Sequence, residues 1–169
     1  MILTPHAIVG ATLANIFPSE PALGFGLAFA SHYVLDMIPH TDYDISNFIN
    51  TDTKTIKSIF KSAGASLHLL FIIIDFVVAI FLCVLLFVRD DKSLLLTAIG
   101  VVGGLLPDLF QFIYCKYKNQ PWIFFQKIHD KLHHIIKAKN EKLWGIFLLF
   151  AIPIFSLIFY FILLPQTHI

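Results

Sequence analysis

The stretch GASLHLLFIIIDFVVAIFLCVLLFV, residues 64–88, decides the fold class. About 20 consecutive, predominantly apolar residues are enough for a helix to cross the hydrocarbon core of a bilayer. The whole chain agrees with this local pattern, because 57% of its residues are hydrophobic, only 14% are charged and its mean hydropathy is +0.79. A soluble domain has about 45–50% apolar and about 25% charged residues. The sequence therefore predicts an integral membrane protein.

Four further apolar segments accompany this helix. They cover residues 4–17, 21–38, 93–114 and 143–164. The first is shorter than the roughly 20 residues that a span needs, and prolines separate it from the second, so the two can form a short hairpin that enters and leaves the membrane on one side. Residues 120–139 show the periodicity of an amphipathic helix. The predicted fold class is all-α: a polytopic membrane bundle of four or five segments plus an interfacial helix.

Two apolar segments carry a ridge of small residues that ends in a polar one, at a spacing of four. These ridges are Gly24, Ala28 and His32, and Gly100, Gly104 and Asp108. Small residues let membrane helices approach closely, so the ridges would draw the two polar ends together. Both regions also contain a break with the pattern apolar-Pro-polar, at Ile38-Pro39-His40 and at Leu106-Pro107-Asp108. Within a single domain, residues 1–169, one interpretation is a duplicated helix pair, about residues 4–44 and 64–115.

The lysines are distributed unequally between the predicted loops. Loops 39–63 and 115–142 contain ten of them, whereas the turn at 89–92 contains one arginine and one lysine. The positive-inside rule then places the two long loops in the cytoplasm, beneath the cell's inner or plasma membrane. The lysines of 116–142 are typical of a surface that faces anionic lipid. The net charge of +1 indicates no nucleic-acid partner, and nothing in the sequence indicates an oligomeric state.

Histidines and aspartates gather at the predicted cytoplasmic ends of five separate elements. Such residues are costly inside a membrane and usually have a function there. Asp75 lies deeper, two turns beyond the histidine of its own helix. The candidate metal ligands are His6, His32, Asp36, His40, His68, Asp108, His129 and His133.

Spacing strengthens the metal hypothesis. His32 and Asp36 are four residues apart, as are His129 and His133, so each pair shares one face of a helix. A pair of ligands at this spacing is what a helix offers to a zinc ion. Carboxylates beside imidazoles either bind the metal or orient a ligating ring. We therefore expect a divalent metal, with zinc as the preferred ion.

The stretch SHYVLDMIPH, residues 31–40, resembles the membrane-bound metal-dependent hydrolases, a group related to zinc-dependent phospholipase C. The soluble enzymes have a similar run of His-Tyr-x-x-Asp followed by Pro and His. The resemblance implies zinc binding by His32, Asp36 and either His40 or Asp42.

Two shorter pieces also resemble the membrane branch of that group. They are Thr4-Pro5-His6 with Gly10, and Gly104-Leu105-Leu106-Pro107-Asp108. The membrane branch often has a His-Arg…Thr-His-Ser stretch, and the nearest piece here is Ser66-Leu67-His68, which departs from it.

These observations predict a membrane-embedded, metal-dependent hydrolase. A bound metal lowers the pKa of its water to roughly 7 and stabilises charge on phosphoryl oxygens, so the expected substrate is a phosphoester, such as a lipid head group or a lipid-linked phosphate. Asp36 and Asp108 are the candidate catalytic residues, each as ligand or as base. The alternative is a non-enzymatic membrane protein, either a metal-binding scaffold or a small transporter with a polar path that includes Asp75.

Overall fold

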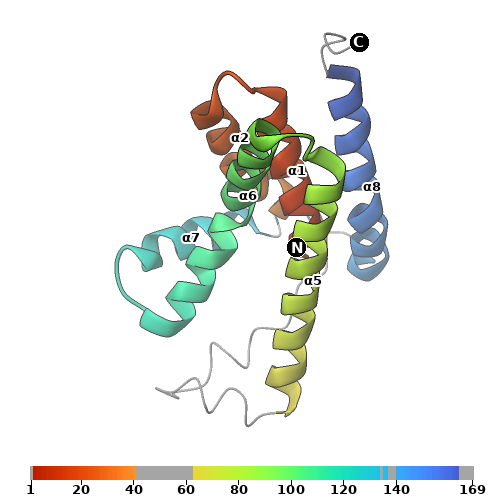
Figure 1. Cartoon of the computed structure of the whole chain (residues 1–169). Helices are drawn as coiled ribbons and strands as arrows, with labels where there is room; N and C mark the ends of the chain where they lie inside the picture. Colours follow the sequence, from red (N-terminus) through yellow and green to blue (C-terminus); the bar gives the residue numbers. More distant parts are fainter. Residues whose placement is uncertain (1, 41–62, 134, 137–139, 164–169) are drawn as a thin grey trace.

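The computed structural model describes residues 2–40, 63–133, 135–136 and 140–163, and within these residues it contains helices and no strand. The helices are labelled in Figure 1. Their bounds are α1 Leu3–Ile16, α2 Pro21–Asp36, α5 Ala63–Phe87, α6 Asp91–Tyr117, α7 Trp122–Leu132 and α8 Glu141–Leu163. The prediction of an all-α fold is confirmed for this part of the chain.

Three of the described helices are long and apolar enough to cross a membrane. The apolar spans are Leu67–Phe87 in α5, Asp91–Tyr117 in α6 and Leu143–Leu163 in α8. The prediction of four or five membrane segments was therefore too high. At 1.5 Å per residue, α1 and α2 are only about 21–24 Å long, less than the roughly 30 Å of a hydrocarbon core. Many large apolar side chains of α5 and α8 are exposed, as lipid contact requires.

Local sequence explains where the helices begin and why one of them continues. The Asp90 side chain accepts a hydrogen bond from the Ser93 backbone N–H (2.7 Å), and the Asp90 backbone N–H donates to the Ser93 hydroxyl (2.9 Å), which forms a capping box at the start of α6. Pro21 opens α2, where its missing N–H costs nothing. The break expected at Pro107 was wrong, because α6 continues through this buried proline. Membrane helices tolerate proline where neighbouring helices enclose it.

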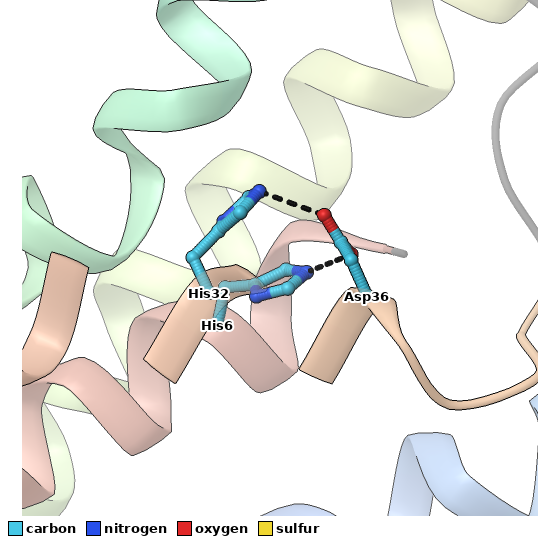
Figure 2. Close-up of side chains that lie close together, drawn as sticks. All are labelled: His6, His32 and Asp36. Atoms are coloured by element: carbon cyan, nitrogen blue, oxygen red, sulfur yellow. Dashed lines mark ion pairs between the residues drawn. The ribbon is translucent and has the colours of Figure 1, made fainter. Parts of the chain in front are cut away.

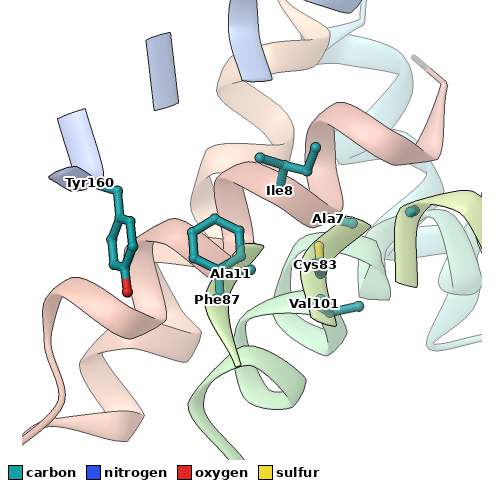
Figure 3. Packing of buried hydrophobic residues seen from close by; sticks show 8 residues of the cluster. Ala7, Ile8, Ala11, Cys83, Phe87, Val101 and Tyr160 are labelled. Carbon is teal, nitrogen blue, oxygen red and sulfur yellow. The ribbon is translucent and has the colours of Figure 1, made fainter. Parts of the chain in front are cut away.

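Helix α1 lies at the centre of the bundle and packs against α2, α5, α6 and α8 (Figure 1). Buried residues lie on nearly every side of α1, as is typical of a helix that is apolar on all its faces. Figure 3 shows the core that forms where these helices meet. It includes Ala7, Ile8 and Ala11 of α1, Cys83 and Phe87 of α5, Val101 of α6 and Tyr160 of α8.

Glycines bring the backbones of α1 and α6 into direct contact. A Cβ atom added at Gly100 would lie 2.2 Å from the carbonyl oxygen of Gly10, and one at Gly104 would lie 2.5 Å from the carbonyl oxygen of His6. The predicted small-residue ridge on α6 is thus a close-packed surface, but its partner is α1. Helix α2 meets α6 one position away, where a Cβ at Gly103 would lie 3.0 Å from that of Ala28. Both histidine-bearing helices are therefore held tightly against α6.

Buried hydrogen bonds add links between α1 and its neighbours. The Asn15 side-chain amide donates to the Thr97 hydroxyl of α6 (3.0 Å), and the Ser156 hydroxyl of α8 donates to that of Thr12 (2.7 Å). Each such bond between membrane helices contributes about 0.6–1.7 kcal/mol. Together with the glycine contacts, these bonds link α1 to α6 and α8.

Candidate metal centre

Three fully buried side chains from two helices form the first part of the candidate centre (Figure 2). His6 comes from α1, and His32 and Asp36 come from successive turns of α2. His6 Nε2 lies 3.3 Å from Asp36 Oδ1, and His32 Nε2 lies 3.0 Å from Asp36 Oδ2. One ligand atom from each of the three lies within 4.8 Å of the others. The predicted proximity of His32 and Asp36 is confirmed, and His6 joins them.

The imidazoles of this group are arranged as metal ligands usually are. His32 Nδ1 lies 2.8 Å from the Gly104 carbonyl oxygen, so Nδ1–H donates to it and Nε2 is the ring nitrogen that faces the carboxylate. Apart from their ion pairs with aspartates, His32 Nε2 and both ring nitrogens of His6 are buried without a hydrogen-bond partner. Leaving one buried polar atom unsatisfied costs about 1–3 kcal/mol. A bound cation would be a partner for His32 Nε2 and for one ring nitrogen of His6, because a neutral imidazole has a single lone pair.

A second group shares Asp36 with the first. Asp36, His129 and His133 also offer three ligand atoms within 4.8 Å of one another. His129 Nδ1 lies 3.8 Å from Asp36 Oδ2, and His40 Nε2 lies 3.7 Å from Asp36 Oδ1 and 3.1 Å from His133 Nε2. His40 Nδ1 donates to the Ile38 carbonyl oxygen (2.6 Å), which leaves its Nε2 lone pair toward the group. The Asp36 carboxylate thus lies between two sets of imidazoles.

The separations between these atoms match those expected around a metal ion. Zinc binds nitrogen and oxygen ligands at about 2.0–2.2 Å, which places neighbouring ligands of a tetrahedron about 3.3–3.6 Å apart. The separations given above run from 3.0 to 3.8 Å. Buried histidine and aspartate groups of this chain could therefore hold a metal ion.

Asp108 of α6 borders the first group and is its most accessible member. Its Oδ1 lies 3.6 Å from His32 Nε2, and its side chain is 22% exposed, whereas that of Asp36 is 2% exposed. The carboxylate is thus near enough to bind or orient a ligand and open enough to meet water. The predicted approach of Asp108 to His32 is confirmed.

Burial keeps one of the outer imidazoles in the form that binds metal. The pKa of His129, on the amphipathic helix α7, is lowered mainly because burial disfavours the charged ring, although Asp36 and Asp108 act in the opposite direction. A lowered pKa leaves His129 neutral at pH 7, and only a neutral imidazole has a lone pair for a cation.

Most of the predicted ligands meet, and one of those that the structure describes does not join them. His6, His32, Asp36, His40, Asp108, His129 and His133 lie in or beside the two groups. His68 lies on α5 outside both groups. It had been predicted as a metal ligand because it lies near one end of its helix. Asp42 lies outside the described residues.

Two participants were missed from the sequence. The Gly104 carbonyl holds His32, and no sequence pattern identifies a backbone acceptor of this kind. Tyr33 packs its ring edge against His32 (5.6 Å between centroids) and His129 (6.3 Å). The position of Tyr33 next to His32 in the sequence was the feature that could have indicated its place in the centre.

The centre lies toward one end of the membrane helices. Asp108 is about 25 Å along α6 from Asp91, at 1.5 Å per residue, whereas the hydrocarbon core is about 30 Å thick. The centre is therefore far from the 89–92 turn, at the end of α6 that leads into the lysine-rich segment.

Comparisons of the chain with protein-family models, curated proteins and solved structures found no match.

Proposed function

We propose that this protein is a membrane-embedded, metal-dependent hydrolase that cleaves a phosphoester. The observation that carries the proposal is the buried Asp36 carboxylate, which lies between two sets of imidazoles contributed by α1, α2, α7 and the residues after α2. A structural ion pair would need one partner for this carboxylate. Five histidines around one aspartate suit a site that holds cations.

The shared carboxylate favours two ions. One would be bound by His6, His32 and Asp36, with Asp108 beside it, and the other by Asp36, His129 and His133, with His40 beside it. Two metals about 3.5–4 Å apart stabilise both the attacking and the leaving oxygen of a displacement at phosphorus. This arrangement supports phosphoester hydrolysis better than simple metal storage.

Asp108 is the residue best suited to handle the attacking water. It borders the first group, and its side chain is partly exposed. Its Oδ2 atom is buried and makes no hydrogen bond. A carboxylate in this position accepts the proton of the water that attacks phosphorus, while Asp36 remains a ligand. This assigns separate roles to the two candidate catalytic residues.

The types of ligand indicate which ion would bind. The position of the centre along the helices indicates the class of substrate. Imidazole-rich sites prefer zinc over magnesium or calcium, which favour oxygen ligands. A centre at the lysine-rich end of the bundle is suited to a lipid head group or a lipid-linked phosphate at the cytoplasmic face of the cell membrane. Transport is less well supported, because Asp75 binds the backbone of α1 instead of continuing a polar path.

Metal analysis of the purified protein tests this proposal first. We expect stoichiometric zinc in the parent, with His32→Ala and Asp108→Ala losing much of it and His68→Ala, the matched histidine outside both groups, keeping it. The measurement is elemental mass spectrometry in mild detergent, followed by a phospholipid hydrolysis assay in which a chelator removes activity and zinc restores it.

Either of two results would contradict the proposal. The first is a parent protein without metal, even after reconstitution, while His32→Ala and Asp108→Ala remain folded. The second is zinc-loaded protein that hydrolyses none of the phospholipids and lipid-linked phosphates offered, which would leave a metal-binding scaffold.

A further inference from the structure

Asp75 is the acidic residue in the apolar span Leu67–Phe87 of α5, and its partners lie on α1. Its Oδ2 accepts a hydrogen bond from the Leu3 backbone N–H (2.6 Å), and its Oδ1 accepts one from the Thr4 hydroxyl (2.5 Å). These donors belong to the first turn of α1. The contact joins segments 71 and 72 residues apart in the chain.

The first turn of α1 has no cap of its own. Ile2 occupies the N-cap position without a side-chain hydrogen bond, and the first turn contains no acidic residue. The N–H groups of a first helical turn lack partners within the helix, and an apolar environment provides no water for them. Pro5 has no N–H to satisfy. Asp75 therefore supplies, from another helix, the cap that the sequence of α1 omits.

His6 follows this capped turn directly. Its ring is fully buried, stacks on the His32 ring (4.1 Å between centroids) and lies 3.3 Å from Asp36 Oδ1. Apart from the ion pair between Nε2 and Asp36, neither ring nitrogen of His6 has a partner that would orient the ring. The place of the His6 ring thus depends on the backbone of α1 as well as on its contacts with Asp36 and His32.

We propose that Asp75 is a positioning residue, which holds the first turn of α1 and thereby places His6 in the metal centre. The inference rests on the proposed metal centre, but the position of His6 can be measured without metal. It gives a definite role to a carboxylate in the middle of an apolar helix.

The first test measures the protection of His6 in metal-free protein. Diethyl pyrocarbonate modifies accessible neutral histidines, and mass spectrometry locates the product. We expect His6 to resist modification in the parent and to react at least tenfold faster in Asp75→Leu, while His32 stays protected. Asp75→Asn keeps an acceptor oxygen and should fall between the two. Ser156→Ala removes the hydrogen bond to Thr12, farther along α1, and should leave His6 protected.

The second test measures metal binding by the same variants. Loss of a group that orients a ligand typically lowers metal affinity 10–100-fold. We expect a loss of that size for cobalt(II) in Asp75→Leu, together with an altered visible absorption spectrum, and parent-like values for Ser156→Ala. If Asp75→Leu does not fold, Thr4→Val removes one of the two hydrogen bonds and should raise His6 reactivity by a smaller factor.

The outcomes separate this inference from the proposed function. Parent-like protection of His6 and parent-like cobalt binding in a folded Asp75→Leu protein would overturn it, as would equal loss of protection at His6 and His32. No rise in His6 reactivity in Thr4→Val would overturn it too. A parent that binds no cobalt would refute the metal centre, while the protection of His6 would still decide the role of Asp75.

Discussion

Asp36→Asn is expected to abolish metal binding at both groups of the centre. Asparagine has nearly the same shape, so the fold should survive, but the amide is a much poorer ligand than the carboxylate that both groups share. We expect an affinity loss beyond the 10–100-fold typical of changes to outer groups. The measurement is metal content per chain, with thermal unfolding at increasing zinc concentration as a second readout.

Zinc is expected to raise the free energy of unfolding of the parent by a definite amount. Zinc at 100 times its dissociation constant should stabilise the parent by about 2.7 kcal/mol for each ion bound, and it should not stabilise Asp36→Asn. Asp130→Asn makes the same chemical change on the exposed face of α7, where Asp130 accepts a hydrogen bond from Gln126, and should behave like the parent. Full metal content in Asp36→Asn would show that the carboxylate is not shared between ions.

Gly100→Ala is expected to destabilise the fold by about 1–3 kcal/mol or more, the usual cost of overpacking. The new Cβ would lie 2.2 Å from the Gly10 carbonyl oxygen and 2.8 Å from the Ala11 Cα, so backbone rather than a movable side chain blocks it. The helices α1 and α6 would have to separate. The measurement is thermal unfolding in detergent, followed by tryptophan fluorescence.

Gly26→Ala is the matched control for this prediction. A Cβ at Gly26 meets nothing within 4 Å, and alanine in a helix is favoured over glycine by about 0.5–1 kcal/mol. This variant should unfold at the parent temperature or above it. If Gly100→Ala and Gly26→Ala unfold at the same temperature, this result would contradict the close packing of α1 against α6.

The parts of the centre that were predictable depend on local spacing. His32 and Asp36 meet because four residues return a helix to the same face, and the same rule applies to His129 and His133. The approach of Asp108 could be expected because glycines precede it on α6 and allow close packing. These patterns need no knowledge of how distant segments meet.

The remaining parts depend on how far one helix is shifted along another. His68 and Asp75 lie two turns apart on α5, and only the packed structure shows that Asp75 is level with the start of α1. The number of spans was overestimated for a related reason. The apolar surface of α1 is covered by other helices, and composition alone does not distinguish that burial from contact with lipid.

The central position of α1 affects the order in which the protein can be completed during synthesis. The hydrogen bond between Thr12 and Ser156 joins residues 144 positions apart. At about 5–20 residues per second, a ribosome needs roughly 7–30 s to produce the second partner after the first. During that interval the earliest helix lacks the last of its neighbours, so the nascent chain must keep a largely apolar segment from aggregating until its carboxyl-terminal part emerges.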